Sequence, residues 1–348
     1  MDALPAGLLA ALVGLIGGLM LGLAARLGEF CTLGAIESAA YGQDQRRLRM
    51  WGVTLCVAII GTFALSALGA IDLSLTIYHG VAWNPAASVV GGLLFGYGMA
   101  YAGNCGFGAL TRFGGGDLRA LVVVVVMAIF GFITLNGPLA PLRDAIFPQS
   151  AADGMQGVAH TFGAVTGLPP FAIAVVVGLG FLAWALAYAP LRGEPRMIFW
   201  AVVAGLAIVS GFWGTSALYH ASFAAVPVEG HTYTAPLGRT LLYLMTSTAG
   251  GLSFPVGSVI GVLAGAFLGS FIRGRFRWEA CEDPRELGRQ VAGAALMGIG
   301  GVIALGCSVG QGLSAFATLA WSAPVTLAAI VVGGLVGLRH LLSGFQPE

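Results

Sequence analysis

Nine apolar runs, each close to the length of a transmembrane helix, constrain this chain more than any other feature of its sequence. A membrane-spanning helix needs about 20 predominantly apolar residues. Only 9% of the 348 residues are charged, too few to cover a globule in water. We therefore predict an all-α integral membrane protein of about nine transmembrane helices, with residues 1–348 forming a single transmembrane domain. The runs are 7–26, 50–71, 82–102, 118–136, 170–189, 197–218, 253–272, 287–305 and 323–340.

The arginines predict the orientation of these spans. All 16 basic residues are arginines, and only Arg143 and Arg239 clearly fall on one side of the nine spans. Cytoplasmic loops are enriched in arginine, so the N-terminus should lie outside and the C-terminus in the cytoplasm. The arginines form no basic stripe with interleaved aromatic residues, so no nucleic acid partner is expected. The predicted cytoplasmic arginines are Arg46, Arg47, Arg49, Arg112, Arg119, Arg192, Arg196, Arg273, Arg275, Arg277, Arg285, Arg289 and Arg339.

One pattern of small residues around a cysteine occurs twice. The stretch "AYAGNCGFGAL" contains Cys105, and the stretch "IALGCSVGQGL" contains Cys307. Both fit the template GxGxxxAxxCxxG, at a constant offset of 202 residues. The first copy ends the third span and the second ends the eighth, so the two spans should run in opposite directions. Inverted repeats of this kind build transporters whose sites lie between the halves. We predict repeat halves at 1–150 and 151–348.

Short segments that follow spans are predicted to enter the membrane without crossing it. They begin at Cys31, Cys105 and Cys307, and irregular backbone of this kind needs cover from protein or from a water-filled cavity. Residues 237–250 are predicted to form a partial helix. Glycines let backbones approach closely, and short helices expose N–H groups that stabilise an anion. A thiol adds a soft contact and a weak donor. This pattern suits a small anion that contains sulfur.

Cys105 and Cys307 are the candidate path residues on these grounds, whereas Cys31 has no cysteine counterpart after the sixth span, at 211–223. Cys56 and Cys281 are interpreted as packing and incidental residues. Asn104 and Gln311 are neutral polar neighbours that either face the path or pack beside it. The other candidate neighbours are Gly106, Gly108, Gly306, Ser308 and Gly310.

Enzyme chemistry has little support in the sequence. The five cysteines form no CxxC pair and no zinc-binding spacing, and no nucleotide or haem motif occurs. His79, His160, His220 and His231 share no ligand spacing, and we expect them at the surface of outer loops. We therefore expect no catalytic residue, metal or cofactor. The alternative class is a membrane thiol enzyme that moves sulfane sulfur or electrons, and a transporter of a selenium compound or sulfite also stays open.

The segments "EFCTLGAIES", "GYGMAYAGNCGFGALTRFGGGDLR" and "RWEACEDPRELGRQVAGAALMGIGGVIALGCSVGQGLSAF" resemble the YeeE/YedE family of bacterial sulfur-compound transporters. Asn104 and Ser308 stand where family members often carry glycine or threonine. The resemblance implies an inner-membrane protein that takes up thiosulfate through an hourglass-like path. It also implies that Cys31, Cys105 and Cys307 line this path and that a TusA-like sulfur-carrier protein binds in the cytoplasm.

Overall fold

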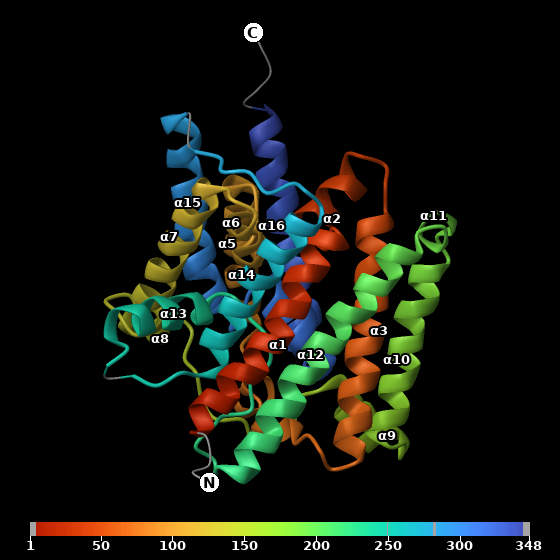
Figure 1. Cartoon of the computed structure of the whole chain (residues 1–348). Coiled ribbons are helices and arrows are strands. Elements are labelled where there is room, and N and C mark those ends of the chain that lie inside the picture. Colours follow the sequence, from red (N-terminus) through yellow and green to blue (C-terminus); the bar gives the residue numbers. More distant parts are fainter. Residues whose placement is uncertain (1–4, 249, 281–282, 344–348) are drawn as a thin grey trace.

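The computed structural model describes residues 5–248, 250–280 and 283–343, and these residues form helices without a β-strand (Figure 1). Every predicted span is a helix, which confirms the all-α membrane class. The boundaries agree with the apolar runs to within a few residues. The nine helices are α1 (Ala6–Leu27), α3 (Arg46–Ala67), α5 (Pro85–Ala102), α7 (Leu118–Leu135), α10 (Pro170–Leu186), α12 (Pro195–Ala221), α14 (Phe254–Ile272), α15 (Pro284–Ile303) and α16 (Ser322–Ser343).

Seven helical stretches among the described residues are long and apolar enough to cross a membrane. Two of them include the short helix that follows: Ala6–Ala40 contains α1 and α2 (Thr32–Ala40), and Pro85–Gly114 contains α5 and α6 (Gly106–Gly114). The apolar α10 has only 17 residues, and the first turn of α15 contains charged side chains. The number of nine crossings therefore stays a prediction. The other five stretches are α3, α7, α12, α14 and α16.

The connecting segments form shorter helices. α13 (Ala235–Thr246) is the partial helix predicted within 237–250, and π-helix η2 (Gly310–Ala315) follows α15. Asp117 begins α7 by accepting a hydrogen bond from the Arg119 amide, as expected of a helix N-cap. The remaining short helices are η1 (Leu73–Leu75), α4 (Ile77–Gly80), α8 (Ala140–Ile146), α9 (Val158–Thr166) and α11 (Ala189–Arg192).

The long helices pack in matching pairs. α1 packs against α14 and α12 packs against α3, while α5 packs against α16 and α15 packs against α7. The pairs match if α1 corresponds to α12, α3 to α14, α5 to α15 and α7 to α16. The contact of α1 with α14 then corresponds to that of α12 with α3, and the contact of α5 with α16 corresponds to that of α15 with α7. In two cases a helix also packs against its own counterpart: α1 contacts α12, and α5 contacts α15. Helix α1 begins at the lower end of the bundle in Figure 1, and α16 ends at the upper end.

The helices that carry the two cysteine templates run in opposite directions. Gly91, early in α5, faces Ala304 just after the end of α15, whereas Gly98, late in α5, faces Gly293 in the middle of α15. This is the direction expected of an inverted repeat. The division into halves 1–150 and 151–348 itself stays a prediction.

Small residues allow the closest helix contact. Glycines recur every four residues on both helices, at Gly14, Gly18 and Gly22 of α1 and at Gly257, Gly261 and Gly265 of α14. A methyl group on Gly257 would overlap the carbonyl oxygen of Ala11. Helix association in a bilayer depends on such close packing, because lipid tails are as apolar as the side chains.

We predict that Gly257→Ala destabilises the bundle by about 2 kcal/mol, because the added methyl group forces the α1 and α14 backbones apart. Gly180→Ala is the matched control, since a methyl group there meets nothing within 4 Å. Its melting temperature in detergent should equal or slightly exceed that of the wild type. Equal melting temperatures for the wild type and Gly257→Ala would contradict the close contact.

Candidate functional site

Three cysteines stand at the start of three short helices, each with the same local hydrogen bond. Cys31 is the N-cap of α2 and Cys105 is the N-cap of α6, while Cys307 precedes the helical turn that continues into η2. Each sulfur accepts the backbone N–H of the glycine three residues later, at N···S distances of 3.5, 3.3 and 3.4 Å respectively. The repeated spacing CxxG is therefore a helix-capping motif in which sulfur replaces the usual oxygen.

The residue two positions before each cysteine has a left-handed backbone. The φ angles are 61° at Glu29, 73° at Gly103 and 55° at Leu305. This conformation ends the long helix and turns the chain into the short one. Glycine adopts it freely, whereas Glu29 and Leu305 carry strain of about 1 kcal/mol or more each. Strain of this kind collects at functional sites, as do π-helical segments such as η2.

The three cysteine segments meet inside the bundle. Thr32, the residue after Cys31, donates its hydroxyl hydrogen to the Ser308 hydroxyl oxygen, which follows Cys307, at 3.1 Å. Ser308, Cys31 and Cys307 all lie close enough to the Cys105 thiol to influence it electrostatically. Cys105 and Cys307 are 0% and 1% exposed, whereas Cys31 is partly exposed. The structure thus brings together three cysteines that the sequence separates by up to 276 residues.

Cys307 has two further partners that the sequence did not predict. The Tyr233 amide donates to its sulfur at 3.2 Å, and the Thr232 hydroxyl lies 3.6 Å from the same sulfur. Two backbone amides therefore donate to this sulfur, from Tyr233 and Gly310, and either the thiol or the Thr232 hydroxyl can be the donor between them. A sequence signal did exist, since the 202-residue offset between the two templates carries Cys31 onto Tyr233. The predicted counterpart region, 211–223, lies instead in the last turns of α12 and the loop after it.

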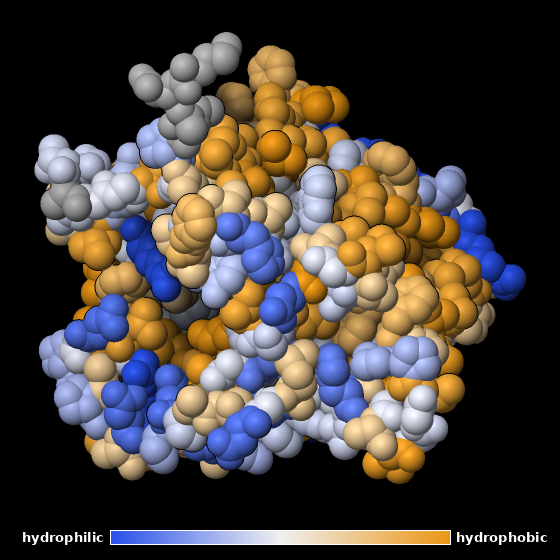
Figure 2. Space-filling model, turned by 90° about the horizontal axis from the view of Figure 1, so that it is seen from below, coloured by the Kyte–Doolittle hydropathy of each residue, from blue (hydrophilic) through white to orange (hydrophobic). Residues whose placement is uncertain are grey.

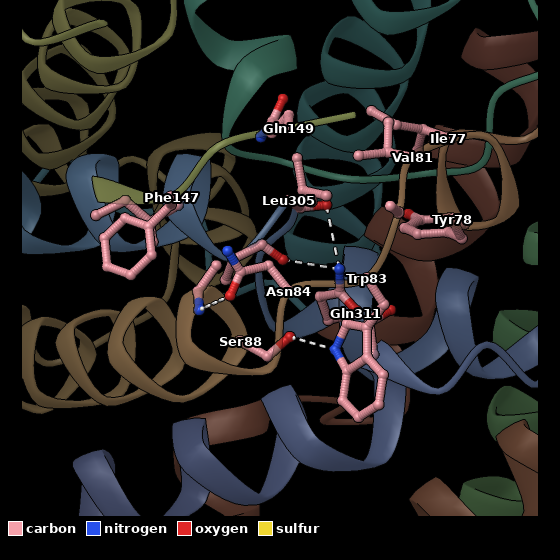
Figure 3. A pocket seen from close by; sticks show the side chains of 15 residues that line it. Ile77, Tyr78, Val81, Trp83, Asn84, Ser88, Phe147, Gln149, Leu305 and Gln311 are labelled. Atoms are coloured by element: carbon pink, nitrogen blue, oxygen red, sulfur yellow. Dashed lines mark hydrogen bonds between the residues drawn. The ribbon is translucent and has the colours of Figure 1, made fainter. Parts of the chain in front are cut away.

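The predicted neighbours have different roles. Gln311 donates its amide hydrogens to the carbonyl oxygens of Ala304 and Leu305, at 2.8 and 3.3 Å, and so caps the broken end of α15 (Figure 3). It lines a small pocket of about 20 Å³, large enough for one water molecule. Asn104 is buried, and its side-chain oxygen has no hydrogen-bond partner among the described residues.

The glycines beside the cysteines permit close contacts. A methyl group on Gly106 would lie 3.0 Å from the Tyr233 carbonyl oxygen, and one on Gly310 would overlap the Thr232 hydroxyl. Gly108 supplies the amide that donates to the Cys105 sulfur, and Gly306 has a φ angle of 158° directly before Cys307.

A cavity of about 330 Å³ lies on the Cys307 side of the site. It is lined by Tyr78, Thr232 and Gly306, which surround Cys307, and by the ion pair of Glu229 with Arg239. The face at this end of the bundle is hollowed, and both hydrophilic and hydrophobic residues border the recess (Figure 2). The cavity is large enough for a small hydrated anion.

The Cys31 side carries a second ionic cluster. Glu29 pairs with Arg47 at 2.8 Å and with Arg273 at 3.3 Å. Arg47 also covers Gly34, so that its guanidinium lies 2.9 Å from where a methyl group on Gly34 would sit. Gly34 is the residue whose amide donates to the Cys31 sulfur. Charged side chains therefore lie on both sides of the cysteine cluster.

The prediction that the loop histidines lie at the surface is wrong for two of them. His79 and His231 are buried, at 3% and 0% exposed, because their loops fold back into the bundle. His231 contacts the Ser258 hydroxyl at 2.7 Å, and the same hydroxyl contacts the Tyr233 hydroxyl at 3.1 Å. This network supports the segment that contacts Cys307. Among the described residues, no group of three or more histidine, cysteine or acidic side chains could hold a metal ion.

Cys56 is buried in α3 with apolar neighbours, in agreement with a packing role. Cys281 lies outside the described residues.

A membrane-scale helix bundle with an internal cluster of capped short helices beside a cavity is an arrangement typical of membrane transport proteins. Residues 27–336 match the family described as "Sulphur transport", and the chain belongs to this family. It is 26% identical to a thiosulfate transporter, TsuA, of Escherichia coli over 339 residues, which cover 92% of each chain. It is also 24% identical to a thiosulfate transporter, TsuA, of Spirochaeta thermophila over 318 residues, covering 89% of this chain and 92% of the relative. Both relatives are named as transporters and not as enzymes.

Proposed function

We propose that this protein takes up thiosulfate across the bacterial inner membrane through a path lined by Cys31, Cys105 and Cys307. The observation that carries the proposal is the convergence of three short-helix N-termini, each beginning with a cysteine, beneath a cavity of about 330 Å³. The printed names of the two relatives support thiosulfate as the substrate.

The chemistry of the cluster suits a dianion that must also leave. Burying a bare dianion in an apolar medium is strongly unfavourable, so the path has to supply donors. Helix N-termini offer N–H groups and a partial positive charge, and thiols offer weak S–H donors to the soft terminal sulfur. Neutral donors of this kind bind the anion less firmly than an arginine would. The anion passes from Cys307 to Cys105 and then to Cys31, without a covalent intermediate.

The same proposal includes the architecture and orientation. The matched helix pairs and the opposite directions of α5 and α15 support two inverted halves with an hourglass-like path between them. The crowding of arginines at one end of the long helices supports a cytoplasmic C-terminus and an N-terminus outside. The ionic cluster around Glu29 then lies at the cytoplasmic opening, and the cavity lies at the outer one.

A membrane thiol enzyme is the second candidate, and the geometry favours it less. Cys31, Cys56, Cys105 and Cys307 are all free thiols. Redox cysteines are usually exposed low-pKa thiols beside a cationic group. Cys105 and Cys307 are instead fully buried, and the sulfur of Cys307 accepts backbone hydrogen bonds. Competition with selenium compounds and with sulfite in the uptake assay tests whether either of them is the substrate in place of thiosulfate.

A TusA-like carrier protein is proposed as the cytoplasmic partner. Arg273 of the predicted cluster is engaged, since it pairs with Glu29 and donates to the Leu27 carbonyl oxygen at 2.8 Å. Arg275, Arg277 and Arg285 are exposed, and the exposed Trp278 lies among them. An aromatic residue flanked by arginines suits an acidic protein surface.

The first test is uptake of isotope-labelled thiosulfate by the full-length protein in proteoliposomes. Cys105→Ala and Cys307→Ala should each lower the initial rate by about tenfold or more, because each removes a donor to a charged ligand. Cys56→Ala is the matched control and should transport at the wild-type rate. If wild-type vesicles take up sulfite or selenite but not thiosulfate, the proposed substrate is wrong. Normal thiosulfate uptake by the double variant Cys105→Ala/Cys307→Ala would refute the cysteine path.

For the partner, the triple variant Arg275→Gln/Arg277→Gln/Arg285→Gln should weaken binding of a purified TusA-like protein by about tenfold, because it removes three exposed charges. Arg143→Gln removes a charge at the opposite end and serves as control. Membrane insertion and thiosulfate uptake without carrier should be unchanged in both. Equal carrier affinity for the triple variant and the wild type would leave these arginines as topology signals only.

A further inference from the structure

Helix α13 begins at the outer cavity with a buried hydroxyl that has no partner. Thr234 is its N-cap, yet its side chain makes no capping hydrogen bond. The residue is 2% exposed, and its hydroxyl oxygen has no hydrogen-bond partner among the described residues. This oxygen faces Gly301, which lines the same cavity. A threonine at an N-cap normally accepts a backbone N–H, so a buried hydroxyl left over suggests that a ligand satisfies it.

Three further donors reach the same cavity. Thr232 lines it and contacts the Cys307 sulfur. Arg239, one turn into α13, also lines it and uses Nη1 to pair with Glu229 at 3.0 Å. A guanidinium has five N–H donors, and this pair occupies one of its nitrogens. The N-terminus of the 12-residue α13 adds backbone amides and a partial positive charge.

We propose that Thr234, Thr232 and Arg239 form an outer oxyanion subsite, with Glu229 as an internal competitor for the arginine. The inference rests on the proposed function and deepens it. The subsite takes the oxygen-bearing end of a small sulfur oxyanion, and Cys307, on the far side of Thr232, faces the terminal sulfur. Glu229 holds Arg239 while the cavity lacks an anion, and the incoming oxyanion replaces the carboxylate.

Glu229 also makes the subsite sensitive to external pH. The charged and titratable groups that face it are Arg239 from α13 and Tyr78 from α4. Burial raises the pKa of Glu229, although Arg239 opposes the shift. Glu229 is negative above its pKa and takes up a proton as the pH falls. Protonation frees Arg239, so anion binding strengthens on acidification.

The test measures binding of thiosulfate, and of sulfate, to the solubilised full-length protein by titration calorimetry. Arg239→Gln should weaken binding of both anions by about tenfold, since it removes a charge-assisted hydrogen bond. Thr234→Val should weaken it by about threefold. Arg143→Gln and Thr240→Val are matched controls: Arg143 pairs with Asp144 on α8, and Thr240 donates to the Pro236 carbonyl oxygen. Both controls should bind like the wild type.

Glu229→Gln should bind thiosulfate more tightly than the wild type, a gain that misfolding cannot produce. Its affinity should also stay constant as the pH is lowered, whereas that of the wild type should rise as Glu229 takes up its proton. Unchanged affinity in both Arg239→Gln and Thr234→Val, or weaker binding by Glu229→Gln, would overturn the subsite. Vesicle uptake by the wild type is scored separately: arginine-dependent binding without thiosulfate uptake would refute the proposed function and leave the subsite standing.

Discussion

The site depends on one constraint: a helix that breaks inside an apolar bundle must still satisfy its backbone N–H groups. Lipid offers no water to do this, so each break needs its own cap. Here the cap is a cysteine sulfur that accepts the amide of the glycine three residues later, at Cys31, Cys105 and Cys307. The left-handed residues Glu29, Gly103 and Leu305 then set the angle at which each short helix enters. Structural capping and the proposed function thus use the same atoms, which ties the stability of each break to the chemistry of the path.

The sequence predicted the long helices well because apolar runs of about 20 residues have few alternatives in a bilayer. The repeated template also predicted that the helices before Cys105 and Cys307 run in opposite directions, as α5 and α15 do. The role of these two cysteines in the path stays a prediction. The contacts across the centre were not predictable in the same way. Thr232 and Tyr233 reach Cys307 from a loop. The 202-residue offset does carry Cys31 onto Tyr233, but a loop has no periodic pattern from which a contact with Cys307 could be read. His79 and His231 were misplaced for that reason, since their loops turn inward and bury polar rings.

Charge is distributed so that the ends of the site differ from its middle. Glu29 with Arg47 lies beside Cys31, and Glu229 with Arg239 lies in the cavity beside Cys307. Between them, Thr32, Ser308 and the cysteines offer neutral hydrogen-bonding groups. Each arginine is already paired with a carboxylate, which limits how firmly it can hold a passing anion. A fixed unpaired arginine at the centre would stabilise a dianion strongly and slow its release, so the neutral centre fits transport better than storage.

The residue type at the N-cap position also differs between the two ends of the site. Under the proposed repeat, α2 and α13 are counterparts, yet α2 begins with Cys31 and α13 begins with Thr234. A hydroxyl is the stronger donor to oxygen, whereas a thiol is softer and more polarisable. Under the proposed function, a hydrated anion presents its oxygens first, and a threonine at the cavity can replace the water on them. The anion would lose that water deeper in the bundle, where weak sulfur contacts would hold it without a deep energy minimum. The break that lacks a cysteine and the break before Cys307 line the same cavity, so a hydroxyl and a thiol stand together at this end of the site.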